Sequence, residues 1–192
     1  MSKKKENEIT IKVICSKNEL LDFLTNQGFK PGEKFSLDDY YYIPISLDIE
    51  NMTVREILSN AIILRYITEE KGITQKITYK IKNFSSNGDI IDQRAINCEV
   101  KDIEDAKKLF EAIGYYEIMN IKEDDIVYCK DGFGLAIKFI KNSDILIEIE
   151  TEPNTEWDTI EKIKAIVSKM NLPIEKGNYF VKKAENELEK VL

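Results

Sequence analysis

The sequence predicts an α+β fold, an eight-stranded antiparallel β-barrel with flanking helices. About eight segments alternate polar and apolar residues or are rich in β-branched and aromatic residues, as strands are. Turn residues join most of these segments as hairpins, which makes the sheet antiparallel. Amphipathic helices lie between and after the strands. Closing such a meander into a barrel removes its open edges, so a barrel is the simplest arrangement.

The first part of the chain predicts two strands and two helices. Residues 8–14 alternate as a half-buried strand, with Glu8, Thr10 and Lys12 on its polar face. Ser16 begins an amphipathic helix that closes at Gly28. A Pro-Gly turn at 31–32, an aromatic strand over 35–43 and a short helix from about residue 53 follow.

The remaining strands follow as hairpins. We expect strands at 61–68, 74–83, 90–100, 115–128, 133–140 and 145–150, with turns at 72, 85–88, 131–132 and 142–143. Helices are expected at 102–113, at 155–170 and from about 179 onward. With 192 residues and no linker-like tract, the chain is expected to form a single domain over residues 1–192.

Composition excludes several classes of chemistry. The chain has no histidine, so a Ser-His-Asp triad, a Cys-His pair and a His-ligated zinc are excluded. The net charge of -7 argues against binding to duplex nucleic acid or to a membrane. Cys15, Cys98 and Cys129 are too far apart for a metal or redox motif, and we expect buried free thiols. No apolar stretch is long enough for a membrane span, which predicts a soluble, cytoplasmic protein.

Acidic and basic residues on the strands suggest a site for a polyphosphate. Glu148 and Glu150 share one strand face, and Lys76, Thr78 and Lys80 share another. Further cations lie on neighbouring strands, namely Arg65, Arg94, Lys122 and Lys138. Carboxylates can hold Mg²⁺ or Mn²⁺ while Lys and Arg neutralise phosphate oxygens, so both signs of charge suit one ligand.

Several of these segments, in their order, resemble the CYTH proteins, also called triphosphate tunnel metalloenzymes. Residues 8–12 are similar to the family's E-x-E-x-K strand, 38–41 to its D-x-Y strand and 64–67 to its L-R-x-R strand. Residues 77–80 resemble the strand that ends in a tunnel lysine, 112–115 the L-G-F/Y element and 147–150 the E-x-E strand. The resemblance covers about residues 6–180, the expected domain core.

The resemblance implies a β-tunnel that binds a small-molecule triphosphate and Mg²⁺ or Mn²⁺. Glu8, Glu148 and Glu150 would be metal ligands, and Lys12 would contact phosphate or help to activate the attacking water as a catalytic residue. The implied phosphate ligands are Lys12, Arg65, Lys80, Arg94, Lys122 and Lys138. The chain departs from the family pattern at Thr10, where a second glutamate is expected, and at Ile67, where a second arginine is expected.

Three functions stay open at this point. The preferred one is metal-dependent hydrolysis of tripolyphosphate or an organic triphosphate, such as a nucleoside or thiamine triphosphate. The second is ATP cyclisation of the kind found in class IV adenylyl cyclases. The third is a non-catalytic module that binds a polyphosphate or a nucleotide. A role in protein interaction ranks below these three. For the charged residues the alternative to a binding site is a strand face exposed to solvent. A homodimer is one possible assembly.

Overall fold

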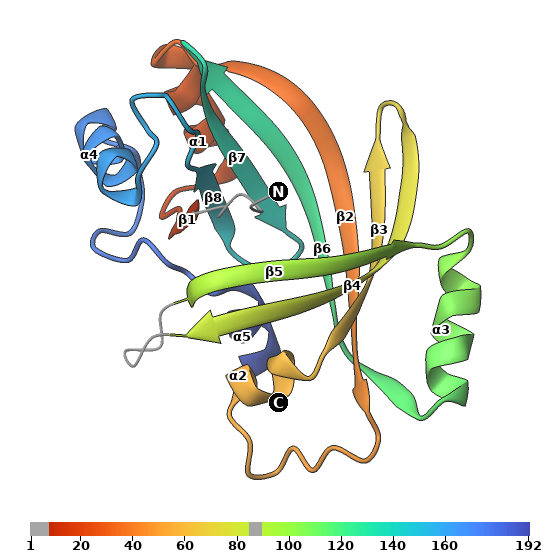
Figure 1. The fold of residues 1–192 in the computed structure, drawn as a ribbon. Helices are drawn as coiled ribbons and strands as arrows, with labels where there is room; N and C mark the ends of the chain where they lie inside the picture. Colours follow the sequence, from red (N-terminus) through yellow and green to blue (C-terminus); the bar gives the residue numbers. More distant parts are fainter. Residues whose placement is uncertain (1–7, 85–89) are drawn as a thin grey trace. The chain divides into compact units, whose positions relative to one another are not determined.

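The computed structural model describes residues 8–84 and 90–192 (Figure 1). Its strands are β1 (Glu8–Lys12), β2 (Lys30–Pro44), β3 (Ile62–Glu69), β4 (Gly72–Phe84), β5 (Ile90–Glu99), β6 (Tyr115–Lys130), β7 (Phe133–Ile140) and β8 (Ile145–Glu150). Its helices are α1 (Lys17–Asn26), α2 (Val54–Ser59), α3 (Ile103–Ala112), α4 (Ile160–Met170) and α5 (Lys183–Glu189). The predicted α+β class and the order of strands and helices are confirmed.

The eight strands form one antiparallel sheet in the order β1-β8-β7-β6-β2-β3-β4-β5. Four hairpins of consecutive strands, β3–β4, β4–β5, β6–β7 and β7–β8, are antiparallel, and β1 joins the sheet antiparallel to β8. Within the described ranges no ladder joins β1 to β5, so the sheet is not closed. The eight strands were therefore predicted correctly, whereas the closed barrel is only a loose match.

The chain divides into two compact units, and β2 and β6 each contribute to both. Unit 1 comprises Met1–Phe35 and Glu123–Lys182, and unit 2 comprises Ser36–Lys122 and Lys183–Leu192. Each unit is described by itself below. The single domain over residues 1–192 stays a prediction.

In unit 1 one face of the sheet is apolar and is covered by α1 and α4 (Figure 1). The alternation of β1 places Ile9 and Ile11 on this face, both with no exposed surface. Ile147 and Ile149 of β8 and Ile163 of α4 belong to the same core cluster. Because side chains alternate along a strand, the residues between these isoleucines lie on the opposite face.

The outer edge of β1 is covered by the segment after α4. Ile14 N–H donates to the Pro173 carbonyl at 2.9 Å, and Glu175 N–H donates to the Lys12 carbonyl at 2.8 Å. Thr10 N–H donates to the Tyr179 carbonyl at 3.0 Å and its carbonyl accepts from Val181 N–H at 2.9 Å. This short strand is thus bonded on both sides, to β8 and to residues 173–181, which protects an edge that would otherwise be open.

In unit 2 a second core lies between α3 and the strands β2 and β3. Phe110 of α3 packs against Tyr42 with ring centroids 5.7 Å apart and against Tyr115 at 5.5 Å. Leu64 of β3 is fully buried in the same cluster. Tyr42, from the aromatic strand expected over residues 35–43, is 1% exposed and belongs to this core.

Two short polar signals set helix starts as predicted. The Ser16 hydroxyl accepts from Glu19 N–H while the Glu19 carboxylate accepts from Ser16 N–H, which is a complete capping box. Thr53 and Glu56 make the same arrangement at the start of α2. Gly132, at φ 84°, lies in the turn between β6 and β7, and Asn142, at φ 59°, lies in the turn between β7 and β8, where turns were expected.

Other local predictions were wrong. The predicted turn at 31–32 lies inside β2, where Gly32 gives room for close approach: an added Cβ would lie 3.3 Å from the Val127 carbonyl oxygen. The three cysteines are free as expected but not buried, since Cys98 and Cys129 are exposed and Cys15 is partly exposed.

The turn predicted at 85–88 lies outside the described residues. In the described part of the chain, no helix combines the length and apolar character that crossing a bilayer requires.

Candidate metal and phosphate site

The polar face of unit 1 is defined by the register of β1 and β8. Glu8 lies opposite Glu150, Thr10 opposite Glu148, and Lys12 opposite Leu146. Directly opposed residues point to the same face of a sheet. The face opposite the isoleucine core therefore carries the N-terminal glutamate, threonine and lysine together with both glutamates of β8.

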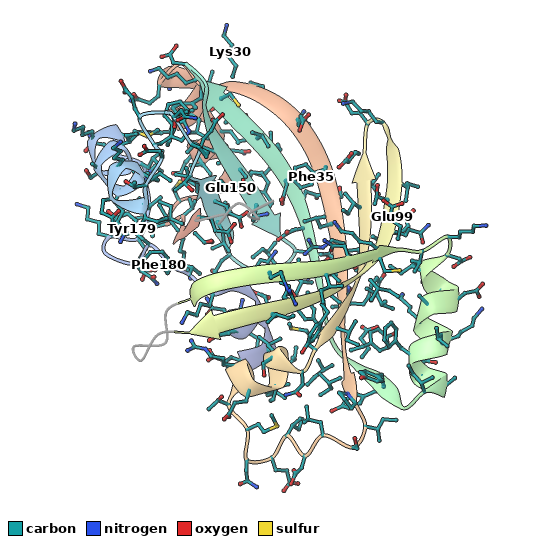
Figure 2. All side chains as sticks on the ribbon, in the orientation of Figure 1. Lys30, Phe35, Glu99, Glu150, Tyr179 and Phe180 are labelled. Atoms are coloured by element: carbon teal, nitrogen blue, oxygen red, sulfur yellow. The ribbon has the colours of Figure 1, made fainter. Side chains whose placement is uncertain are left out.

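Three of these carboxylates converge. Glu8, Glu148 and Glu150 each offer an oxygen, and the three oxygens lie within 4.8 Å of one another. None of the three side chains is buried, and Figure 2 labels Glu150 on its strand. Oxygen donors from several carboxylates with room for water suit a hard cation such as Mg²⁺ or Mn²⁺. The residues predicted as metal ligands thus lie together in a geometry that fits such an ion.

Next to this cluster lies a buried lysine. Lys138 of β7 is only 7% exposed, and its Nζ is 2.8 Å from Asp125 Oδ2, 3.6 Å from Glu123 Oε1 and 3.8 Å from Glu148 Oε2. Burial by itself would lower the pKa of this lysine, but the charges of Glu148, Glu123 and Asp125 outweigh it and raise the pKa well above its ordinary value. Lys138 therefore stays charged, with three carboxylates as its partners.

Lys12 has a different partner from the one expected. Its Nζ forms an ion pair at 2.8 Å with Asp144, in the turn before β8. The hydrogen bond to Asp144 raises the pKa of Lys12. Burial lowers this pKa, but the negative charges of Asp144 and Glu175 raise it further, and the net change is upward. Lys12 is therefore a charged cation on the polar face of unit 1, held by Asp144.

Unit 2 carries a buried ion pair on β2 and β3. Arg65 donates from Nε to Asp39 Oδ1 at 2.6 Å and from Nη2 to Asp39 Oδ2 at 2.5 Å. Asp39 is 1% exposed, so this two-point contact is almost fully removed from water. The sequence predicted Arg65 as a phosphate ligand, and the structure shows that a carboxylate orients its guanidinium.

The register of β3, β4 and β5 sorts the cations of unit 2 by face. Arg65 lies opposite Lys76, and Lys80 follows on the same face of β4. Burial lowers the pKa of Lys76, and the Arg65 charge lowers it further. Arg94 lies opposite Ile81, which places it on the other face of the sheet.

Lys122 also lies apart from Arg65. It forms an ion pair at 3.0 Å with Asp38, whereas Arg65 binds the next residue, Asp39, and successive residues of a strand point to opposite faces. Burial would raise the pKa of Asp38, but hydrogen bonds from Asn120, Lys122 and Tyr40 lower it below its usual value. Lys122 is consequently part of a polar network on the face opposite Arg65.

The structure therefore groups the predicted residues in two sets. In unit 1 the three glutamates, Lys12 and Lys138 share one face, and in unit 2 Arg65 and Lys80 share one face. Their partners were not named as site residues from the sequence: Asp39, Glu123, Asp125 and Asp144. Strand periodicity could have revealed Glu123 and Asp125, because they lie two and four residues after the buried Ile121 and therefore on the same face of β6.

Solved structures of other proteins share this fold. A protein from Pyrococcus horikoshii matches 96% of this chain and 99% of its own, at 18% identity and a TM-score of 0.67. A candidate adenylate cyclase from Vibrio parahaemolyticus matches 97% and 98% of the two chains at 13% identity, with a TM-score of 0.59. A candidate adenylyl cyclase from Hippeastrum, described as having a dominant triphosphatase activity, matches 98% and 97% at 11% identity, with a TM-score of 0.60.

These likenesses establish the fold, which is CYTH-like as the sequence predicted. No model of a known protein family matches the chain. No curated protein matches its sequence.

Proposed function

We propose that this protein binds a triphosphate compound together with Mg²⁺ or Mn²⁺ and hydrolyses its phosphate chain. The observation that carries the proposal is the convergence of Glu8, Glu148 and Glu150, whose oxygens lie within 4.8 Å of one another on one sheet face. A CYTH-like fold and a similar structure described as a triphosphatase support it.

The three glutamates would hold the cation through oxygen ligands, and water would complete the coordination because none of them is buried. A cation bound there supplies charge for the phosphate oxygens and lowers the pKa of a coordinated water. Lys12, held by Asp144 at 2.8 Å, would donate to a phosphate oxygen from the same face. Its raised pKa keeps it protonated at neutral pH, so we assign it binding rather than proton removal from water.

Unit 2 carries a set of cations of its own, Arg65, Lys76 and Lys80, which the register places on one face, and we propose that this set by itself can bind phosphate oxygens. Asp39 orients the Arg65 guanidinium, and a fixed guanidinium matches phosphate geometry better than a mobile one. Arg94 and Lys122 each lie on the face of the sheet opposite Arg65, Lys76 and Lys80, so they have no part in the proposal.

The test is phosphate release from tripolyphosphate and from ATP with Mg²⁺ or Mn²⁺. The Glu148→Ala/Glu150→Ala variant removes two proposed ligands, and Glu70→Ala/Glu156→Ala is the matched control because it removes two exposed carboxylates elsewhere. We expect metal-dependent release that falls at least about a hundredfold in the first variant and is unchanged in the second. Equal release from both variants would exclude the site.

The second candidate is a binding module without turnover. It is favoured by Thr10, which lies opposite Glu148 where a further carboxylate would have added a ligand. This module would bind Mn²⁺ and tripolyphosphate, both measurable by calorimetry, but release no phosphate from any substrate. Formation of cyclic AMP and pyrophosphate from ATP in the same assay would instead identify a cyclase.

A further inference from the structure

Lys138 is a buried cation that touches the candidate metal site through one shared carboxylate. Its Nζ lies 2.8 Å from Asp125, 3.6 Å from Glu123 and 3.8 Å from Glu148. Glu148 also belongs to the cluster with Glu8 and Glu150. One glutamate therefore stands between an internal ammonium group and the place proposed for a divalent cation.

The pairing of strands β6, β7 and β8 builds this arrangement. Asp125 lies directly opposite Lys138, and Glu148 lies opposite Ala136, two residues along the same face of β7. Diagonal neighbours at this spacing are within reach of a long side chain such as lysine. All of these residues belong to unit 1, so the arrangement is set within one compact body.

The charges on this face explain why an internal cation is needed. Five carboxylates, those of Glu8, Glu123, Asp125, Glu148 and Glu150, are linked through Glu148, and Glu123, Asp125 and Lys138 are buried. Buried carboxylates that share a site repel one another and need a paired charge. The carboxylate oxygens that now surround Lys138 belong to Glu123, Asp125 and Glu148. Without Lys138, these oxygens could act as ligands of a second divalent cation.

We propose that Lys138 is a positioning residue that takes the place of a second metal ion. Its ammonium group neutralises Glu123 and Asp125 and holds Glu148 beside Glu8 and Glu150, so that the chain binds one divalent cation. The inference rests on the metal binding in the proposed function and assigns Lys138 a role other than the predicted phosphate contact.

The experiment measures the number of Mn²⁺ ions bound by the full chain, by electron paramagnetic resonance and calorimetry, with no triphosphate present. We expect one ion for the wild type, two for Lys138→Met and one for Lys138→Arg, which keeps the charge. One ion for Lys138→Met, or two for the wild type, would overturn the inference while leaving the proposed function intact. No ion for the wild type would overturn the proposed function and this inference with it.

The Lys138→Met variant leaves buried carboxylates without their lysine, so its folding is followed by circular dichroism in EDTA and in Mn²⁺. If the variant is unfolded in EDTA, recovery of the folded signal by Mn²⁺ but not by Na⁺ at equal ionic strength would support the inference. Failure of Mn²⁺ to restore the fold would overturn it. The Lys138→Arg variant is the control and should fold in both buffers.

Discussion

At the scale of single residues, the charged side chains of this protein are paired more fully than their sequence positions indicate. Arg65 was predicted as a phosphate ligand from the resemblance to the CYTH proteins. The structure adds Asp39, which is 1% exposed and binds the guanidinium at two points. A residue that binds phosphate through such a partner is oriented before the ligand arrives.

We expect Asp39→Asn to lower the free energy of unfolding by about 3 kcal/mol, because it leaves a mostly buried guanidinium without its counter-charge. The double variant Asp39→Asn/Arg65→Met should recover most of this loss, since it removes the unpaired charge as well. Urea denaturation followed by circular dichroism measures both changes. A loss below about 0.5 kcal/mol for Asp39→Asn would show that the pair does not stabilise the fold.

At the scale of secondary-structure elements, the position of Glu8 depends on how β1 is held. This strand has only five residues, and it is bonded to β8 on one side and to residues 173–181 on the other. Tyr179 and Phe180, labelled in Figure 2, lie in that covering segment, where Lys164 of α4 is 4.7 Å from the Phe180 ring centroid. The covering segment thus helps to place a proposed metal ligand that is remote from it in sequence.

We expect Val181→Pro to speed hydrogen exchange of the β1 amides by about tenfold or more, because proline lacks the N–H that donates to the Thr10 carbonyl. Val181→Ala is the matched control, since it shortens the side chain and keeps the donor. Exchange is measured by mass spectrometry on peptides that contain residues 8–12. Equal protection in the two variants would mean that the segment does not hold β1.

At the scale of the whole molecule, the proposed metal site connects the first described strand to the last strand of the sheet. Glu8 lies in β1 and both other glutamates lie in β8, about 140 residues later in the chain. A cation bound by both strands would stabilise the folded state over the unfolded state, in which these residues are apart.

We expect Mn²⁺ at about a hundred times its dissociation constant to stabilise the wild type by about 2.7 kcal/mol, which corresponds to a rise in Tm of about 5–10 °C. The Glu148→Ala/Glu150→Ala variant should lose this rise, and the Glu70→Ala/Glu156→Ala control should keep it. Thermal unfolding in Mn²⁺ and in EDTA measures the effect. A rise of equal size in all three proteins would place the bound cation elsewhere.

Local signals in the sequence were sufficient for most elements. Alternation predicted β1, strands were expected where β7 and β8 lie, and helix starts were expected at Ser16 and near residue 53, where α1 and α2 begin. The covering segment at 173–181 was not predicted, because its backbone hydrogen bonds depend on β1 rather than on its own pattern. The extended start of β2 was missed because Pro31 and Gly32 usually mark turns, whereas here they lie in a strand.

The sequence by itself determined the class of fold, the strands and the faces on which Glu8, Glu148 and Glu150 lie, because periodicity and capping are local properties of the chain. Only the tertiary structure decided which charges meet, including Lys138 with Asp125 and Arg65 with Asp39. Such pairs depend on strand order and register, which join residues 13 and 26 positions apart in these two cases. Because the free energy of a charge depends on what lies within a few ångströms of it, no local pattern can assign these roles.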